Sequence, residues 1–183
     1  IAPSYVTAAP GEAGALDLMG KILADGATSR LYRKLVVEDK VASSAGGSFE
    51  GSGLDSGKIS LYAIGVDNDL SKVEAAMAKV IADIRANGVT AAELQRAKNS
   101  YIAAYTYESD NQMTLARRYG WSLSLGRSIE QIENWPEAIA KVTVDDIKKV
   151  ADRYLEARGS VTGQLLPTPP AVEAQGTPTR PRS

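Results

Sequence analysis

The stretch Lys58-Ile59-Ser60-Leu61-Tyr62-Ala63-Ile64 decides the fold class, because larger apolar side chains alternate with polar ones along most of it. A period of two places Ile59, Leu61 and Ala63 on one face of a β-strand. A Ser- and Gly-rich segment, residues 41–50, precedes this strand, and a glycine-rich connection joins the two. We therefore expect an antiparallel hairpin with a long connection.

Helical periodicity lies on both sides of this hairpin. Apolar side chains recur every three or four residues in segments 16–23, 70–84, 94–104 and 147–155. The first segment ends at Asp25-Gly26 and the second at Asn87-Gly88, where a glycine can adopt the left-handed conformation that closes a helix.

Helix starts are marked by capping boxes, in which a hydroxyl and a carboxyl or amide group three residues later satisfy free backbone donors. The pattern begins at Ser71, Thr90 and Ser128, and a weaker form begins at Thr143. These starts agree with the apolar periods, so the sequence predicts a largely helical chain.

Two further strands are predicted at Tyr5-Val6-Thr7 and at residues 160–166. With the hairpin they predict an α+β, two-layer sandwich, a mostly antiparallel sheet with helices packed on one face. One sheet edge is expected to be covered by chain that this sequence lacks. We expect residues 1–166 to form one domain and the Pro-rich tail, residues 167–183, to be disordered.

The composition excludes several classes of function. The chain has 183 residues, is 44% hydrophobic and has a net charge of -1, so bulk electrostatics favour neither nucleic acid nor an anionic membrane. No apolar run approaches the roughly 20 residues that span a bilayer.

The sequence contains no histidine and no cysteine. Their absence excludes Ser-His-Asp and Cys-His catalysis, and a zinc site would have only oxygen ligands, which suit zinc poorly. The chain is therefore expected to act through shape, packing and partners, with no cofactor of its own.

One nucleophilic route is left, a serine–lysine dyad. Ser29, Ser43 and Ser44 lie near Lys34 and Lys40 in the sequence. No glycine elbow frames them, and an activated lysine requires burial. A serine–lysine hydrolase is the least favoured of the hypotheses.

Three acidic groups invite a functional interpretation. Glu38-Asp39 and Asp145-Asp146 are possible acid–base pairs, although acidic residues near helix ends usually cap the helix or face solvent. Asp67-Asn68-Asp69 resembles the start of a calcium loop, but the glycine and distal glutamate of such a loop are missing. A polar turn leading into the helix at Leu70 is the preferred interpretation.

Glycines and aromatic residues form two more candidate sites. Gly46-Gly47, Gly51 and Gly53 lack the Lys-Ser/Thr of a phosphate-binding loop, so hairpin geometry explains them better. The aromatic side chains that form a possible binding stripe are Tyr101, Tyr105, Tyr107, Tyr119 and Trp121. Their spacing favours helix packing.

Arg117-Arg118-Tyr119-Gly120-Trp121 is the strongest candidate for substrate binding. Two guanidinium groups beside two aromatic rings suit the recognition of a peptide or a carboxylate. The competing interpretation, which we favour, has both arginines facing solvent while Tyr119 and Trp121 pack.

Four blocks of sequence resemble one family. They are AGALDLMGKILADGATSRLYRKLV at 13–36, AELQRAKN at 92–99, LARRYG at 115–120 and VTVDDI at 142–147. The chain thereby resembles the C-terminal, non-catalytic domain of the pitrilysin-like (M16) zinc metallopeptidases, above all the bacterial type related to mitochondrial processing peptidase. The resemblance covers essentially residues 1–167.

The resemblance implies how such a domain works. Zinc would be held by a His-x-x-Glu-His motif in a separate N-terminal domain, over which this domain closes like half of a clamshell. Active relatives often contribute an arginine and a tyrosine at positions that match Val36 and Ser43 here, so that contribution is expected to be absent or to come from elsewhere. Family domains also usually begin with a strand–helix unit before the segment that matches Tyr5, and we expect this chain to lack that unit, so that its domain is incomplete. The resemblance implies a periplasmic location in bacteria.

The leading hypothesis is a non-catalytic M16 domain that completes a peptide-binding chamber for a zinc-bearing domain or subunit. The alternative is a stand-alone interaction module that assembles, for example as a homo-oligomer, through an exposed sheet edge.

Overall fold

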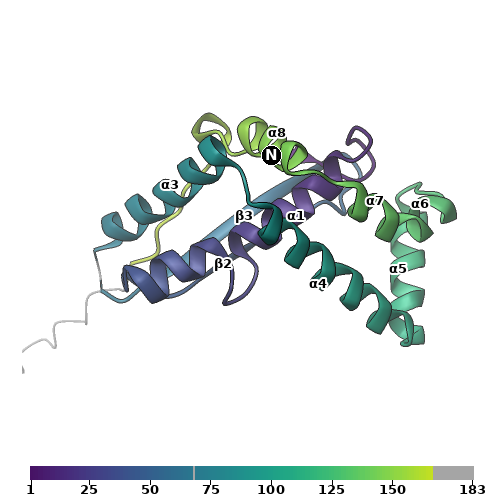
Figure 1. The fold of residues 1–183 in the computed structure, drawn as a ribbon, viewed down its shortest axis with the longest axis horizontal. Coiled ribbons are helices and arrows are strands. Elements are labelled where there is room, and N and C mark those ends of the chain that lie inside the picture. Colours follow the sequence, from purple (N-terminus) through teal and green to yellow (C-terminus); the bar gives the residue numbers. More distant parts are fainter. Residues whose placement is uncertain (68, 167–183) are drawn as a thin grey trace, which may run out of the picture.

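A computed structural model describes residues 1–67 and 69–166 (Figure 1). The strands are β1 (Ala2–Pro3), β2 (Ala42–Glu50) and β3 (Ser56–Gly65). The α-helices are α1 (Glu12–Ala24), α2 (Arg30–Tyr32), α3 (Leu70–Asn87), α4 (Ala91–Ser109), α5 (Gln112–Ser124), α6 (Ile129–Glu133), α7 (Trp135–Lys141) and α8 (Val144–Tyr154). A π-helix, η1 (Arg33–Glu38), continues α2, and a 3₁₀ turn, η2 (Ala157–Gly159), follows α8.

The sheet has the order β1-β3-β2 and is antiparallel throughout. Strands β2 and β3 form the predicted hairpin, in which Phe49 pairs with Ile59 and Ala45 with Ala63. These residues face the helices, as the alternating pattern predicted, whereas Tyr62 on the opposite face is 55% exposed.

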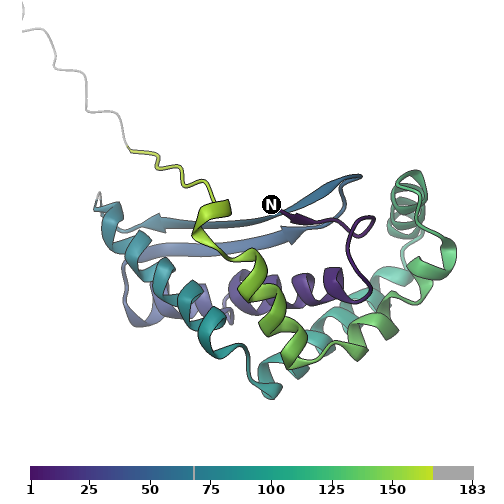
Figure 2. The same ribbon diagram turned by 90° about the horizontal axis from the view of Figure 1, so that it is seen from above.

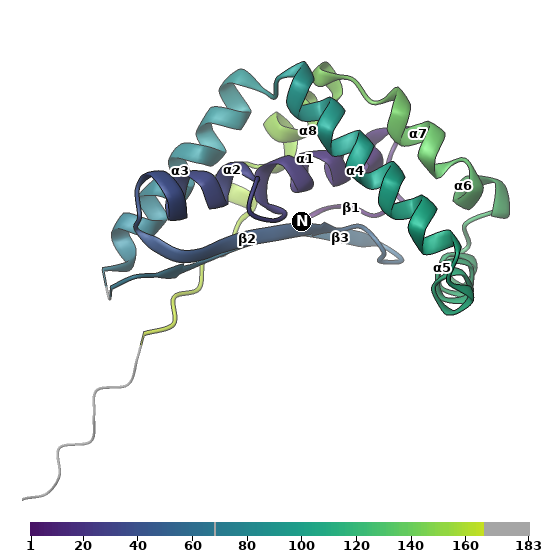
Figure 3. The same ribbon diagram turned by 60° about the horizontal axis from the view of Figure 1, so that its bottom comes forward.

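The helices α1, α3 and α8 lie together on one face of the sheet, and Figures 2 and 3 show this second layer clearly. Helices α4 to α7 continue the layer and extend beyond one end of the sheet (Figure 1). The predicted α+β architecture, with a small antiparallel sheet covered on one side, is therefore confirmed.

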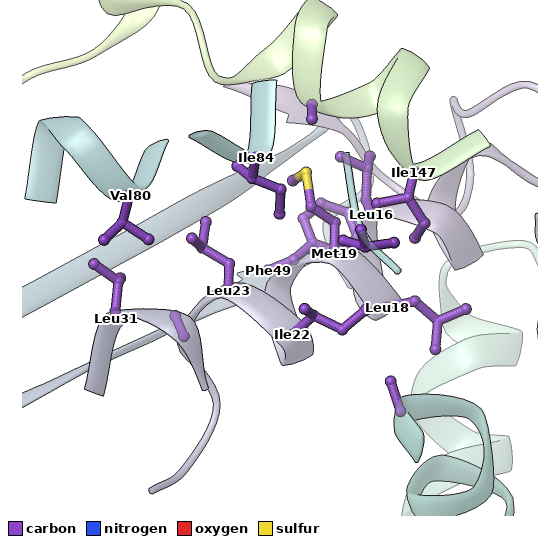
Figure 4. Close-up of a cluster of buried hydrophobic side chains, with 14 of the residues drawn as sticks. Leu16, Leu18, Met19, Ile22, Leu23, Leu31, Phe49, Val80, Ile84 and Ile147 are labelled. Atoms are coloured by element: carbon purple, nitrogen blue, oxygen red, sulfur yellow. The ribbon is translucent and has the colours of Figure 1, made fainter. Parts of the chain in front are cut away.

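Helix α1 is the centre of the core (Figure 4). Leu16, Met19 and Leu23 have no exposed surface and pack between the sheet and the outer helices. Burying each such side chain contributes about 1.5–3 kcal/mol. Gly20 lets the helix approach the sheet closely, because a Cβ at this position would lie 3.1 Å from the Phe49 backbone nitrogen.

Most of the predicted helix ends are confirmed. Helix α3 ends at Asn87, and Gly88 follows with a φ of +67°. Capping boxes form at Thr90, Ser128 and Thr143. The box predicted at Ser71 is wrong, because α3 already begins at Leu70, so that Ser71 lies inside the helix and its hydroxyl hydrogen-bonds the Asp69 carboxylate instead.

Two predicted strands are absent from the described residues. Residues 5–7 form a turn closed by the bond from the Thr7 amide to the Ser4 carbonyl, and the N-terminal strand is Ala2–Pro3 instead. Residues 160–166 have an apolar pattern typical of a strand, but Val161 and Leu165 are 99% and 94% exposed and pair with no strand. The prediction of four strands was therefore wrong, and the sheet has three.

Along the part of the chain that the structure describes, β3 pairs with β1 only at Ser56 and Gly57. The backbone of β3 from residue 58 onward is therefore unpaired on that side. No helix in the described ranges has both the length and the apolar character of a membrane span. The tail predicted for residues 167–183 lies outside the described residues.

Candidate functional site

A cavity of about 540 Å³ opens between the tip of the β2–β3 hairpin and the helices α1, α5 and α7. We call it the aromatic cavity. Its walls are Tyr5, Asp17, residues 49–53 of the hairpin, Trp121, Arg127 and Trp135. Four aromatic side chains, two carboxylates and one guanidinium group therefore surround one space, an arrangement that offers both apolar and polar contacts to a ligand.

Asp17, Tyr5 and Trp135 form a hydrogen-bonded relay in the wall of this cavity. The Tyr5 hydroxyl donates to the Asp17 carboxylate, and the Trp135 indole N–H donates to the Tyr5 oxygen over 2.7 Å. The Tyr101 hydroxyl donates to the backbone carbonyl of Asp17 over 3.2 Å. The relay ties together segments that are more than one hundred residues apart in the sequence.

The electrostatics of this relay follow from its burial. Loss of solvent raises the pKa of Asp17 to about 6, while the Tyr5 hydrogen bond and the Arg127 charge oppose the rise. Burial and the adjacent carboxylate also raise the pKa of Tyr5. The Arg127 guanidinium lies 4.7 Å from the centre of the Tyr5 ring, as in a cation–π contact.

Two tyrosine rings pack against Trp135. The Trp135 ring stacks on the Tyr105 ring at a centroid distance of 5.5 Å and meets the Tyr101 ring edge-on at 5.8 Å. Tyr101 and Tyr105 of the predicted aromatic stripe are thus packing residues, whereas Tyr107 is 80% exposed. These two aromatic contacts hold the Trp135 indole in its position in the wall of the aromatic cavity.

The candidate residues on α5 have different environments. The Arg118 guanidinium lies 3.9 Å from the centre of the Tyr105 ring and forms a 2.8 Å ion pair with Glu108, whereas Arg117 is exposed. Arg118 therefore packs, contrary to our expectation that both arginines face solvent. The Tyr119 hydroxyl hydrogen-bonds Glu133 over 3.2 Å.

Trp121 is the residue of this motif that reaches the aromatic cavity. Its indole N–H donates to the Ser52 carbonyl over 3.3 Å, and 59% of the residue is exposed. The expectation that Trp121 packs is therefore wrong for most of this side chain. Substrate binding by Arg117, Arg118 and Tyr119 stays a prediction.

The predicted glycines serve the hairpin. A Cβ at Gly47 would collide with the Ser60 carbonyl oxygen on the paired strand. A Cβ at Gly51 would lie 2.6 Å from the Phe49 ring, at the edge of the aromatic cavity. Gly46, Gly47, Gly51 and Gly53 thus lie in or beside the paired strands, as the hairpin interpretation predicted.

The serine–lysine candidates are engaged elsewhere. The Ser29 hydroxyl caps α2 by accepting the Tyr32 amide. The Lys34 ammonium lies 2.8 Å from Asp39 and 3.5 Å from Glu38, so this acidic pair is an ion-pair partner. Ser43 and Ser44 lie on β2, and Lys40 is exposed in the turn before it. No serine–lysine contact forms among these described groups.

The other acidic groups have structural roles. Asp146 completes the capping box of α8, with Asp145 beside it in the first turn. Asp67 accepts the Asp69 amide over 2.9 Å, as in a polar turn, while Asn68 lies outside the described residues.

The positions matched to the family's arginine and tyrosine are also described. Val36 lies in η1 and packs against the core, and Ser43 is exposed on β2, where its hydroxyl donates to the Ile64 carbonyl over 3.2 Å.

Zinc does not fit the described residues. The sequence supplies no imidazole or thiolate, and residues 1–67 and 69–166 contain no group of three acidic side chains placed to hold a metal ion. No step of chemistry is therefore assigned to a metal in this chain.

Asp17, Arg127 and Trp135 were missed by the sequence analysis. Asp17 had a detectable pattern, since it is a single carboxylate on the apolar face of a helix between Leu16 and Leu18. Arg127 and Trp135 lie in no motif, and only the folding of α5 to α7 against the hairpin brings them to Tyr5.

Comparison with known proteins identifies the class. The family model of the peptidase M16 inactive domain matches residues 5–101, more than half of the chain. The chain therefore belongs to the peptidase M16 inactive-domain family. This description agrees with the expectation that the chain has no peptidase activity on its own. Among curated proteins, none matches the chain.

Solved structures share the fold. The inactive peptidase domain of a candidate zinc protease from Bordetella parapertussis superposes with a TM-score of 0.77 at 20% identity, over 90% of this chain and 87% of that one. A protease from Helicobacter pylori gives 0.73 at 19% identity, over 85% of this chain and 37% of that one. A peptidase M16 inactive domain from Pseudomonas fluorescens gives 0.67 at 17%, over 85% and 36%. The chain thus spans about a third of the two longer proteins.

Proposed function

We propose that this chain is the non-catalytic half of an M16 zinc metallopeptidase. It completes the peptide-binding chamber for a domain or subunit that carries a His-x-x-Glu-His motif, and the zinc belongs to that partner. Membership of the inactive-domain family is the observation that carries the proposal. The match to only 37% of the Helicobacter pylori protease further supports a role as one part of a larger enzyme.

The aromatic cavity is the surface we assign to the peptide. Trp121 is exposed at its mouth, and Asp17 and Arg127 offer charges of both signs inside it. An extended peptide contributes backbone donors and acceptors as well as side chains, so a mixed apolar and polar wall suits it. The periplasm remains the predicted location.

Reconstitution tests this proposal. Hydrolysis of an unstructured fluorogenic peptide is measured for a His-x-x-Glu-His partner alone, for this chain alone and for both together. We expect activity above that of the partner only in the mixture. Equal activity with and without this chain would contradict the proposal.

Cavity variants sharpen the test. Trp121→Ala and Arg127→Gln should raise the KM of the mixture with less effect on kcat, because they remove contacts with bound peptide. Tyr107→Ala is the matched control, since Tyr107 is an exposed aromatic residue on α4 outside the cavity. A control that raises KM as much as the cavity variants would show that the aromatic cavity is not the peptide site.

A stand-alone assembly module is the second candidate function. The observation that favours it is the unpaired edge of β3 beyond Gly57 in the described part of the chain. Such an edge can pair with a strand of another molecule. Sedimentation of the purified chain tests this alternative, which requires a stable homo-oligomer and no gain in peptidase activity in the reconstitution.

A further inference from the structure

A second cavity, of about 580 Å³, lies between α1, the α2–η1 segment, α3 and α4. We call it the basic cavity. Six basic and four acidic side chains line it, which gives it a charge of +2 in a chain whose net charge is -1. It shares no residue with the aromatic cavity.

The acidic side chains of the basic cavity are already paired. Arg30 holds Glu93 through two hydrogen bonds of 2.8 Å and Asp83 through one of 3.0 Å, which joins α2 to α3 and α4. Lys21 pairs with Asp25 at 2.8 Å. Lys34 pairs with Glu38 at the rim. All four carboxylates of the cavity therefore form ion pairs with only three of its six basic side chains.

The other three cations are Arg33, Lys79 and Arg96. They come from three separate elements, η1, α3 and α4, and none forms an ion pair with a carboxylate in residues 1–67 and 69–166. All three residues are exposed, and no carboxylate of the described residues offsets their charge through an ion pair, so each is available to an anion in the cavity.

The floor of the basic cavity is apolar. Ile22, Val80 and Ala97 line it and are at most 8% exposed, and Figure 4 shows Ile22 and Val80 within the buried cluster. A hydrated inorganic ion would gain nothing from this floor. An organic molecule can contact the edge of this floor and the aliphatic stems of the lining Lys and Arg side chains while its acidic groups reach the cations.

We propose that the basic cavity binds a small organic polyanion carrying two or more phosphate or carboxylate groups. Arg33 and Arg96 would each offer a planar pair of N–H donors to such a group, and Lys79 a point charge. This site is independent of the peptide chamber, because neither zinc nor a peptide takes part in it.

Calorimetric titration of the full chain with citrate and with adenosine 5′-diphosphate tests this site. The structure predicts binding of at least one of them with a Kd of about 1 mM or tighter at low salt. Binding of citrate alone identifies a carboxylate ligand, and binding of the diphosphate alone identifies a phosphate ligand. The affinity should fall as ionic strength rises from about 0.02 to 0.3 M.

Two triple variants test whether the anion binds in the basic cavity. Arg33→Gln, Lys79→Gln and Arg96→Gln together should weaken it about tenfold or more, given that each exposed ion pair contributes modestly. Lys40→Gln, Lys149→Gln and Arg158→Gln together remove the same charge outside the cavity and should change Kd less than about twofold. Circular dichroism verifies that both triple variants are folded.

Two results would overturn the proposal. One is the absence of binding of either anion up to about 10 mM. The other is equal weakening by the two triple variants, which would assign the effect to the overall charge of the protein.

Discussion

Asp17 gives the chain a pH dependence of stability that can be calculated from the structure. Burial raises the pKa of its carboxyl group from 3.8 to about 6. Since the folded-state pKa lies above the unfolded value, the folded chain keeps a proton here that the unfolded chain has released. The stability from this proton is fully present below about pH 3.8 and is lost as the pH rises through about 6.

The magnitude follows from the difference between the two pKa values. A difference of about 2 corresponds to about 3 kcal/mol of unfolding free energy. Asp17 is partly accessible from the aromatic cavity, so we expect a smaller effect, about 1–2 kcal/mol. Asp17→Asn keeps an acceptor for the Tyr5 hydroxyl but cannot ionise. This variant should be more stable than the parent by about 1–2 kcal/mol at pH 7.5, and the difference should nearly vanish at pH 4.

Urea denaturation followed by circular dichroism from pH 4 to pH 8 measures this difference. Asp55→Asn, which removes an exposed carboxylate, is the control and should follow the profile of the parent. A loss of stability in the Asp17→Asn variant that is equal at every pH would refute the reasoning. That result would mean that ionisation of Asp17 is not coupled to folding, so that its pKa is the same in the folded and the unfolded chain.

Two further predictions concern stability alone. Arg30 lowers the pKa of Glu93 from 4.5 to about 2 through its hydrogen bonds, so this pair stabilises the fold above pH 4.5 and loses its effect as the pH falls towards 2. Arg30→Gln should therefore lower the unfolding free energy by about 1–2 kcal/mol at pH 7 and by less at pH 2.5, and a pH-independent loss would argue against an ionic contribution. Gly120→Ala should raise stability by about 0.5–1 kcal/mol, because a methyl group there meets no atom within 4 Å, and thermal denaturation showing a lower Tm would count against it.

The sequence was sufficient to predict the elements whose own residues determine them. The hairpin follows from alternation along β3, and α1, α3, α4 and α8 follow from apolar periodicity. Three capping boxes formed because each hydroxyl lay one residue before its helix. These features depend on neighbours within a few residues, which the sequence displays directly.

The predictions were wrong where contacts between residues far apart in the sequence determine the local structure. Residues 160–166 have the residue types of a strand, yet a strand needs a partner, and the sequence does not show one. Tyr5 was predicted to lie in a strand, but its hydroxyl is held by Asp17 and Trp135. The same reason explains why the aromatic cavity was not predicted, since it joins residues from six separate segments.

The most direct test of the account measures zinc binding and peptide hydrolysis by the isolated chain. We expect no stoichiometric zinc on the chain after exposure to the metal and dialysis, and no hydrolysis of an unstructured peptide with or without added zinc. Stoichiometric zinc together with zinc-dependent cleavage by this chain alone would contradict the claim that the metal and the chemistry belong to a partner.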